Sequence, residues 1–112
     1  MTTLISRDDL RAAIEAHTVI VVDALGGDYW ARQHLPGAIP LVADDVATKA
    51  PELLPDKAAA IVTYCSNPAC PNSHAVASRL EQLGYTNVRR YREGIEDWMS
   101  AGLPVESVQP AR

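Results

Sequence analysis

A short apolar run, followed by a loop with two prolines and a helical repeat, most constrains what this chain can fold into. The run Ile61–Tyr64 is rich in β-branched and aromatic residues, which is typical of a buried strand. Proline interrupts regular structure, and apolar residues then recur at helical spacing from Val76 to Leu83, before Gly84 at the position expected for a helix C-terminus. The pattern predicts a strand, a loop and a helix in succession, with Ser73 as the N-cap of the helix.

Cys65 directly follows this predicted strand. Loop N–H groups that turn toward a helix N-terminus favour negative charge, so we expect a lowered pKa and a nucleophilic thiolate near neutral pH. The same N–H groups are suited to hold an anionic substrate. A buried structural cysteine is the alternative interpretation. The predicted anion-binding loop consists of Ser66, Asn67, Pro68, Ala69, Cys70, Pro71, Asn72 and Ser73.

A second apolar run, residues 19–22, ends in Asp23. Its continuous apolarity predicts a strand that is covered on both faces. Ligands of open α/β sheets bind beyond the carboxyl ends of the strands. We therefore expect Asp23 to lie at the same sheet edge as Cys65 and to support the site.

Strands and helices alternate along the rest of the chain. We expect further extended segments over residues 3–5, 39–41 and 87–91, with the two arginines of the last one facing solvent. Helices are expected from the Ser6 cap to about residue 17, over 28–33, over 44–49 where Pro51 closes the helix, and over 95–101. This alternation predicts one α/β domain over residues 1–112, with its core over about 4–106 and a frayed tail over 105–112.

Composition excludes several classes of protein. The net charge of −4 favours neither nucleic acid nor an anionic membrane as a partner, and no apolar run is long enough to cross a bilayer. Two cysteines are too few for a disulfide scaffold. The N-terminus lacks the apolar core of a signal peptide, so we expect a cytoplasmic location.

Several short motifs, taken in order, resemble a single-domain rhodanese. They are Asp23, the His-Leu-Pro-Gly-Ala turn at 34–38, Tyr64-Cys65, Leu83-Gly84-Tyr85, Glu93-Gly94 with Trp98, and Ala-Gly-Leu-Pro-Val at 101–105. The resemblance implies a rhodanese-like three-layer α/β domain with a five-stranded, mainly parallel sheet flanked by helices. It also implies a cysteine that carries sulfane sulfur as a persulfide, without a metal or an organic cofactor.

The chain departs from this family at three places. The common family loop is C-x-x-G-x-R-S, whereas seven residues separate Cys65 from Ser73 here, Pro68 replaces the glycine, and the loop contains no Lys or Arg. Leu25 replaces an arginine that usually follows the strand-end Asp, and Tyr29 stands where the family often has Glu. These differences predict a wider and less positive anion pocket.

The resemblance implies a sulfurtransferase whose Cys65 takes sulfur from thiosulfate or a persulfide donor and passes it to cyanide, a cellular thiol or a protein acceptor. An alternative is a sulfur-carrier or redox-sensing module with little turnover. In that interpretation Cys70 is a resolving thiol that attacks the Cys65 persulfide and forms a disulfide. A phosphatase or arsenate reductase is disfavoured because the loop lacks an arginine, and a zinc site on the two cysteines is disfavoured because a second pair of ligands is missing.

Overall fold

The computed structural model describes residues 3–108, in which five strands form one parallel sheet in the order β1-β5-β4-β2-β3. The strands are β1 (Thr3–Leu4), β2 (Ile20–Asp23), β3 (Ile39–Pro40), β4 (Ile61–Tyr64) and β5 (Val88–Tyr91). Tyr64 at the end of central β4 is in register with Asp23 on one side and Tyr91 on the other. Cys65 therefore begins just past the carboxyl edge of the sheet, and the predicted five-stranded parallel architecture is confirmed.

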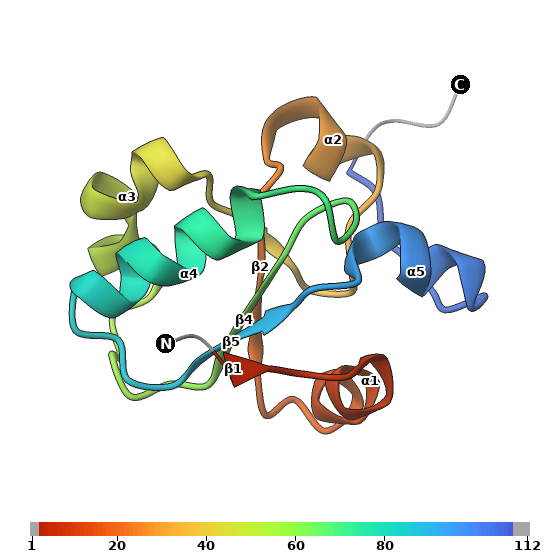
Figure 1. Cartoon of the computed structure of the whole chain (residues 1–112), viewed down its shortest axis with the longest axis horizontal. Coiled ribbons are helices and arrows are strands. Elements are labelled where there is room, and N and C mark those ends of the chain that lie inside the picture. The colour runs from red at the N-terminus through yellow and green to blue at the C-terminus, as the bar shows by residue number, and fades with distance from the viewer. Residues whose placement is uncertain (1–2, 109–112) are drawn as a thin grey trace.

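Helices cover both faces of this sheet (Figure 1). They are α1 (Arg7–Glu15), α2 (Gly27–Arg32), α3 (Val46–Leu53) after a 3-10 turn at Ala43–Asp45, α4 (Asn72–Gln82) and α5 (Gly94–Ser100). In Figure 1, α3 and α4 lie together on one side of the strands, and α1 lies on the other. Within residues 3–108, no helix combines the length and the apolar character that crossing a bilayer requires.

Two apolar clusters, one on each face, explain why β4 has no polar face. The α4-side core includes Ile61 and Cys65 together with residues of α3 and α4, and the α1-side core includes Val62 and Tyr64 together with residues of α1 and α5. Successive side chains of a strand point to opposite faces, so a strand buried on both sides needs an unbroken apolar run. The same alternation brings Cys65 to the α4 face.

The third helix is longer than the sequence predicted. It begins at Val46 and continues through Pro51 to Leu53, although proline removes one helical hydrogen bond. Val46 and Ala50 are fully buried in the α4-side core, and the hydroxyl of Tyr85 lies against the carbonyl oxygens of Ala50 and Leu54. Burial and this side-chain contact at the helix end thus outweigh the missing bond.

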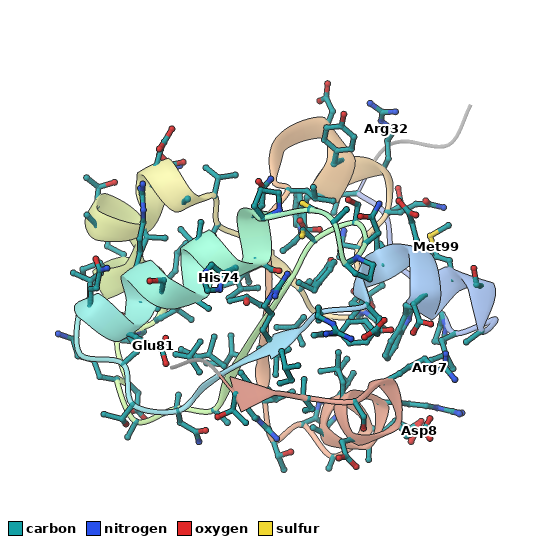
Figure 2. All side chains as sticks on the ribbon, viewed as in Figure 1. Arg7, Asp8, Arg32, His74, Glu81 and Met99 are labelled. Carbon is teal, nitrogen blue, oxygen red and sulfur yellow. The ribbon has the colours of Figure 1, made fainter. Side chains whose placement is uncertain are left out.

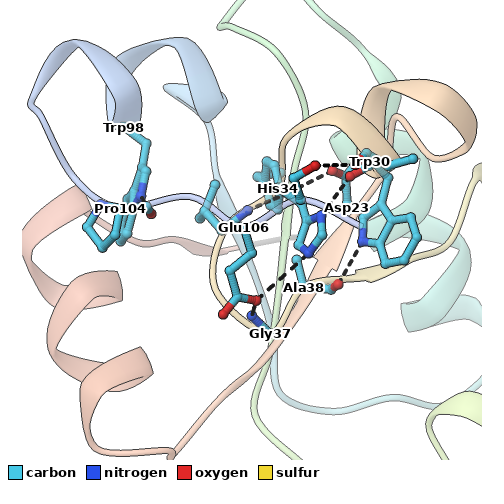
Figure 3. A network of polar contacts seen from close by, with 12 residues as sticks. Asp23, Trp30, His34, Gly37, Ala38, Trp98, Pro104 and Glu106 are labelled. Carbon is cyan, nitrogen blue, oxygen red and sulfur yellow. Dashed lines mark hydrogen bonds and ion pairs between the residues drawn. The ribbon is translucent and has the colours of Figure 1, made fainter. Parts of the chain in front are cut away.

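The expectation of a frayed tail from residue 105 is wrong for its first four residues. Glu106 forms an antiparallel bridge with His34 and accepts a hydrogen bond from the Gly37 N–H at 2.8 Å, as Figure 3 shows. Val108 donates its N–H to the carbonyl oxygen of Ala31 at 3.0 Å. The segment is held because its backbone groups have partners and Val105 packs on the α1-side core. Residues 109–112 of the predicted tail lie outside the described residues.

Candidate active site

The N-terminus of α5 holds the beginning of the cysteine loop. The Ile95 and Glu96 N–H groups donate to the carbonyl oxygens of Cys65 and Ser66, at 2.9 and 3.0 Å. Gly94 allows this close approach, since a Cβ built on it would lie 2.5 Å from the carbonyl carbon and oxygen of Ser66. Gly94 also has a φ of +79°, a conformation that L side chains rarely adopt. The loop start is therefore fixed by backbone contacts that depend on this glycine.

An Asx turn folds the loop back over the first cysteine. The side-chain oxygen of Asn67 accepts the Ala69 N–H at 3.0 Å, and its carbonyl oxygen accepts the Cys70 N–H at 3.1 Å. The Cys65 thiol lies 3.3 Å from the carbonyl oxygen of Cys70, to which it donates. The two cysteines, five positions apart in sequence, are thus brought into direct contact.

Ser73 is not the N-cap that the sequence predicted. Helix α4 begins at Asn72, with Pro71 in the cap position, and the Ser73 side chain is buried. Its hydroxyl lies 3.5 Å from the Cys65 sulfur and accepts a hydrogen bond from Arg90 Nε at 2.8 Å. Since the oxygen accepts from the guanidinium, its own proton is free to point at the sulfur.

Arg90 is the residue of this site that the sequence reasoning missed. It was expected to face solvent, but it is half-buried, and besides Ser73 its Nη2 atom reaches the carbonyl oxygen of Cys70 at 3.5 Å. Strand alternation puts Arg90 on the same face as Thr63, its partner in register, whose hydroxyl donates to the Ser73 carbonyl oxygen. The pairing of Arg90 with Thr63 is the signal by which Arg90 could have been predicted. The loop contains no cation of its own, and the guanidinium beside it belongs to Arg90 of the neighbouring strand β5.

The pKa of the Cys65 thiol is raised, contrary to the lowered value that the sequence predicted. Burial is the largest cause, and a hydrogen bond to the Cys70 side chain acts in the same direction. Hydrogen bonds from the Ser73 hydroxyl and N–H oppose these effects without overcoming them. The prediction failed because it counted the helix N-terminus and not the desolvation of a cysteine that is 1% exposed.

The pKa of the Cys70 thiol shifts the other way. Burial disfavours its thiolate, but hydrogen bonds from the Cys65 thiol, from the N–H groups of Asn72 and Ser66 and from the Ser66 hydroxyl together lower the pKa. The loop N–H groups that we expected to stabilise Cys65 are therefore divided between two sulfurs. In the reduced pair, Cys70 is the more acidic thiol.

Asp23 lies at the predicted sheet edge and is fully buried. Its carboxylate accepts the Leu25 and Gly26 N–H groups, at 2.7 and 3.1 Å, and the Tyr64 hydroxyl, at 2.7 Å. Burial and the Asp23 charge raise the pKa of Tyr64, so this phenol stays protonated and donates. Tyr64 also accepts the Leu35 N–H at 3.0 Å, so Asp23 supports the backbone around the site and its hydrogen bonds do not reach Cys65.

The remaining loop and histidine side chains lie away from the thiols. Pro68, Ala69 and Pro71 are exposed, and His74 projects from the exposed face of α4 (Figure 2). His34 contacts the Trp30 carbonyl oxygen and the Glu106 carboxylate. Over residues 3–108, no three His, Cys, Asp or Glu side chains are grouped in a way that could hold a metal ion.

A pocket of about 250 Å³ borders the loop at Ser66. Side chains of α2 and α5 form its walls, and Figure 2 shows Arg32 on α2 and Met99 on α5 at this side of the molecule. Tyr29 and Met99 are large apolar side chains that remain exposed there. The surface beside the loop therefore offers apolar contact, and its lining carries one basic and one acidic side chain, Arg32 and Glu96.

Comparison with known proteins supports the same family over nearly the whole chain. A family model described as Rhodanese-like domain matches residues 6–101. The chain is 32% identical over 106 residues to an HTH-type transcriptional regulator (Rv0324) of Mycobacterium tuberculosis, covering 95% of this chain and 46% of the regulator. It thus spans about half the length of the curated relative that it matches.

Solved structures show the same fold. The BH2092 protein of Bacillus halodurans aligns with a TM-score of 0.86 and 28% identity, over 96% of this chain and 78% of that one. A thiosulfate sulfurtransferase of Pseudomonas aeruginosa aligns with a TM-score of 0.79 and 22% identity, over 99% of this chain and 21% of that one. The second similarity concerns the fold alone.

Proposed function

The chain belongs to the rhodanese-like domain family, and from that membership we propose that it is a sulfurtransferase that carries sulfane sulfur on Cys65. The observation that carries the proposal is the position of the Cys65 sulfur at the end of the central strand, 3.5 Å from the hydroxyl of Ser73. That hydroxyl is in turn held by Arg90. The arrangement suits a nucleophile that becomes an anion during the reaction.

The proposed reaction has two half-reactions on one sulfur atom. The Cys65 thiolate attacks the outer sulfur of thiosulfate, the sulfur–sulfur bond of the donor breaks, and sulfite leaves with the bonding electrons. Cyanide or a thiol then attacks the outer sulfur of the persulfide, and the Cys65 thiolate leaves. A persulfide donor follows the same course and releases a thiol. We assign this chemistry to a reducing compartment such as the cytoplasm, where thiol acceptors are abundant.

Initial-rate kinetics and mass spectrometry test this proposal. Thiosulfate and cyanide varied against each other should give parallel double-reciprocal lines, because sulfite leaves before the acceptor binds. Protein treated with thiosulfate and desalted should gain the mass of one sulfur atom, at least transiently. Intersecting lines together with no gain in mass, at any time after mixing, would overturn the proposal.

Arg90 is the cation that we assign to the anion site. Its guanidinium bonds the Ser73 hydroxyl and approaches the Cys70 carbonyl oxygen, so its charge lies along the same loop as the nucleophile. A hydroxyl that accepts from a guanidinium becomes a stronger donor toward a thiolate. The neighbouring Arg92 contacts only the exposed side chain of Glu93 among the bonds of the described residues, so it provides a matched comparison.

Replacing Arg90 by Gln should lower kcat/KM for thiosulfate by roughly 10-fold, since hydrogen bonds to charged groups contribute about 1.5–3 kcal/mol. The loss should appear in KM and in a shift of the rate–pH profile to higher pH, which a merely structural role would not produce. Arg90→Lys should recover part of the loss, and Arg92→Gln should match the wild type. Equal kinetics for Arg90→Gln and Arg92→Gln would contradict the assignment.

The pH dependence of alkylation should separate the two thiols. The thiolate is the reactive species, and its fraction grows about tenfold per pH unit below the pKa. Iodoacetamide should modify Cys70 first near neutral pH, and modification of Cys65 should still accelerate above pH 9, the ordinary value of the thiol. In Cys70→Ser the Cys65 profile should move to lower pH, because the Cys70 hydrogen bond and charge both raise the Cys65 pKa. Peptide mapping measures each site, and Cys65 reacting first would contradict the prediction.

A sulfur-sensing module is the second candidate function. The contact between Cys65 and Cys70 favours it, because a pair of adjacent thiols can record exposure to sulfane sulfur as a change of oxidation state. The regulator of Mycobacterium tuberculosis supports the same idea, since 46% of its length is covered by a chain of this kind. In this role turnover with cyanide would be slow, while formation of the persulfide would be retained.

A further inference from the structure

We propose that Cys70 is an internal acceptor for the sulfur on Cys65, so that the chain reduces sulfane sulfur to sulfide and is left with a Cys65–Cys70 disulfide. This inference rests on the Cys65 persulfide of the proposed function. It adds a distinct product, because the sulfur leaves as sulfide without an external acceptor. The substrate class is an oxidised sulfur donor such as thiosulfate or a persulfide.

The geometry of the loop favours an internal acceptor. Cys65 is 1% exposed, whereas Cys70 is only partly buried. The Asn67 turn holds the Cys70 backbone so that its carbonyl oxygen lies 3.3 Å from the Cys65 sulfur, and the two thiols are close enough to shift each other's pKa. Cys70 therefore lies beside the sulfur that would carry the persulfide, whereas an external thiol has to reach a buried atom.

The loop also stabilises Cys70 in the form that attacks. The N–H groups of Ser66 and Asn72 and the Ser66 hydroxyl donate to the Cys70 sulfur, which lowers the pKa of this thiol. Attack on a persulfide requires a thiolate, and attack is faster when the leaving group is stable as an anion. Hydrosulfide is such a leaving group. Seven residues separate Cys65 from Ser73, so the loop can place these N–H groups around Cys70 while Ser73 keeps its contact with Cys65.

The proposed step balances without an added oxidant. The Cys70 thiolate attacks the inner sulfur of the persulfide, which is Cys65 Sγ, and forms the bond between the two cysteines. The bond from Cys65 Sγ to the outer sulfur breaks, and hydrosulfide leaves with its electrons. The outer sulfur is reduced to sulfide and the two thiols are oxidised to a disulfide. Two equivalents of an external thiol then restore the reduced pair by exchange.

The test measures sulfide and intact mass together, in reduced and desalted protein under anaerobic conditions, with thiosulfate and no acceptor. We expect wild type to release one equivalent of sulfide and to lose two hydrogen atoms as the disulfide forms. Cys70→Ser should release no sulfide and keep one added sulfur. Wild type that keeps the persulfide and releases no sulfide would overturn the inference and leave the proposed function intact.

The reverse reaction provides a second test that needs neither thiosulfate nor a variant. Wild type oxidised to the Cys65–Cys70 disulfide should react with sodium sulfide and gain one sulfur and two hydrogens, and peptide mapping should locate the persulfide at Cys65. A persulfide found at Cys70 instead, or no intramolecular disulfide after oxidation, would overturn the inference. A persulfide formed here, with none formed from thiosulfate in any variant, would support the pair chemistry and count against thiosulfate as the donor.

Discussion

Cys65→Ser should abolish sulfur transfer from thiosulfate to cyanide, with a fall of roughly 10³-fold or more, to the rate of the uncatalysed reaction. A hydroxyl neither carries sulfane sulfur nor ionises in the accessible pH range, so both half-reactions lose their carrier atom. The fold should survive, because serine is close to cysteine in size. Its hydroxyl can still donate to the Cys70 carbonyl oxygen, which the thiol contacts at 3.3 Å. Circular dichroism and urea unfolding verify the fold, and the rate of thiocyanate formation gives the loss.

Cys70→Ser is the control for this loss. It removes the second thiol of the loop and leaves Cys65 and its contact with Ser73 in place. The persulfide should still form in this variant, and more readily near neutral pH, because Cys70 raises the pKa of Cys65. If Cys65→Ser kept its sulfur loading and Cys70→Ser lost it, Cys70 would be the entry point for sulfur and the assignment of the nucleophile would be wrong.

The fold of this chain could be read from its sequence because its signals are local. The continuous apolar runs ending at Asp23 and Tyr64 are central strands, and Gly84, with a φ of +99°, ends α4 as predicted. The error at Pro51 has a non-local cause. Burial of Val46 and Ala50 and the contact of Tyr85 with the helix end come from tertiary packing, which a propensity argument does not include.

The site was predicted less completely because its electrostatics depend on distant residues and on burial. Arg90 is 25 positions after Cys65 and reaches the loop only through the register of β4 and β5. Tyr91, the next residue, points into the α1-side core, so strand alternation would have placed Arg90 on the α4 face. The pKa of Cys65 depends on how deeply the sulfur is buried, and the loop sequence alone does not determine that.

The position of Arg90 also bears on the loop arginine that the family resemblance implies and that this chain lacks. The Arg90 guanidinium of β5 donates to the Ser73 hydroxyl, at the end of a loop that itself contains no Lys or Arg. The extra length accommodates Cys70 and the N–H groups around it. The Arg90 guanidinium and Cys70 therefore both lie against the same loop, beside Cys65.

Gly94→Ala should disrupt this site more than any other single-methyl change that we consider. Its Cβ would lie 2.5 Å from the carbonyl carbon and oxygen of Ser66 and 2.7 Å from the Asn67 nitrogen, and these backbone atoms belong to the cysteine loop. Gly102→Ala is the matched control, since its φ of +76° is equally unfavourable and nothing lies within 4 Å of the added Cβ. Urea unfolding of the two variants separates the collision from the backbone strain.

We expect Gly102→Ala to lower the free energy of unfolding by about 1–2 kcal/mol, which is the left-handed strain alone. Gly94→Ala should lose a further 1–3 kcal/mol or so, as in an overpacked core. If the loop moves to relieve the collision, the Ile95 and Glu96 hydrogen bonds to Cys65 and Ser66 break, and thiosulfate turnover falls in the protein that remains folded. Equal stability and equal turnover of the two variants would mean that α5 does not hold the cysteine loop in place.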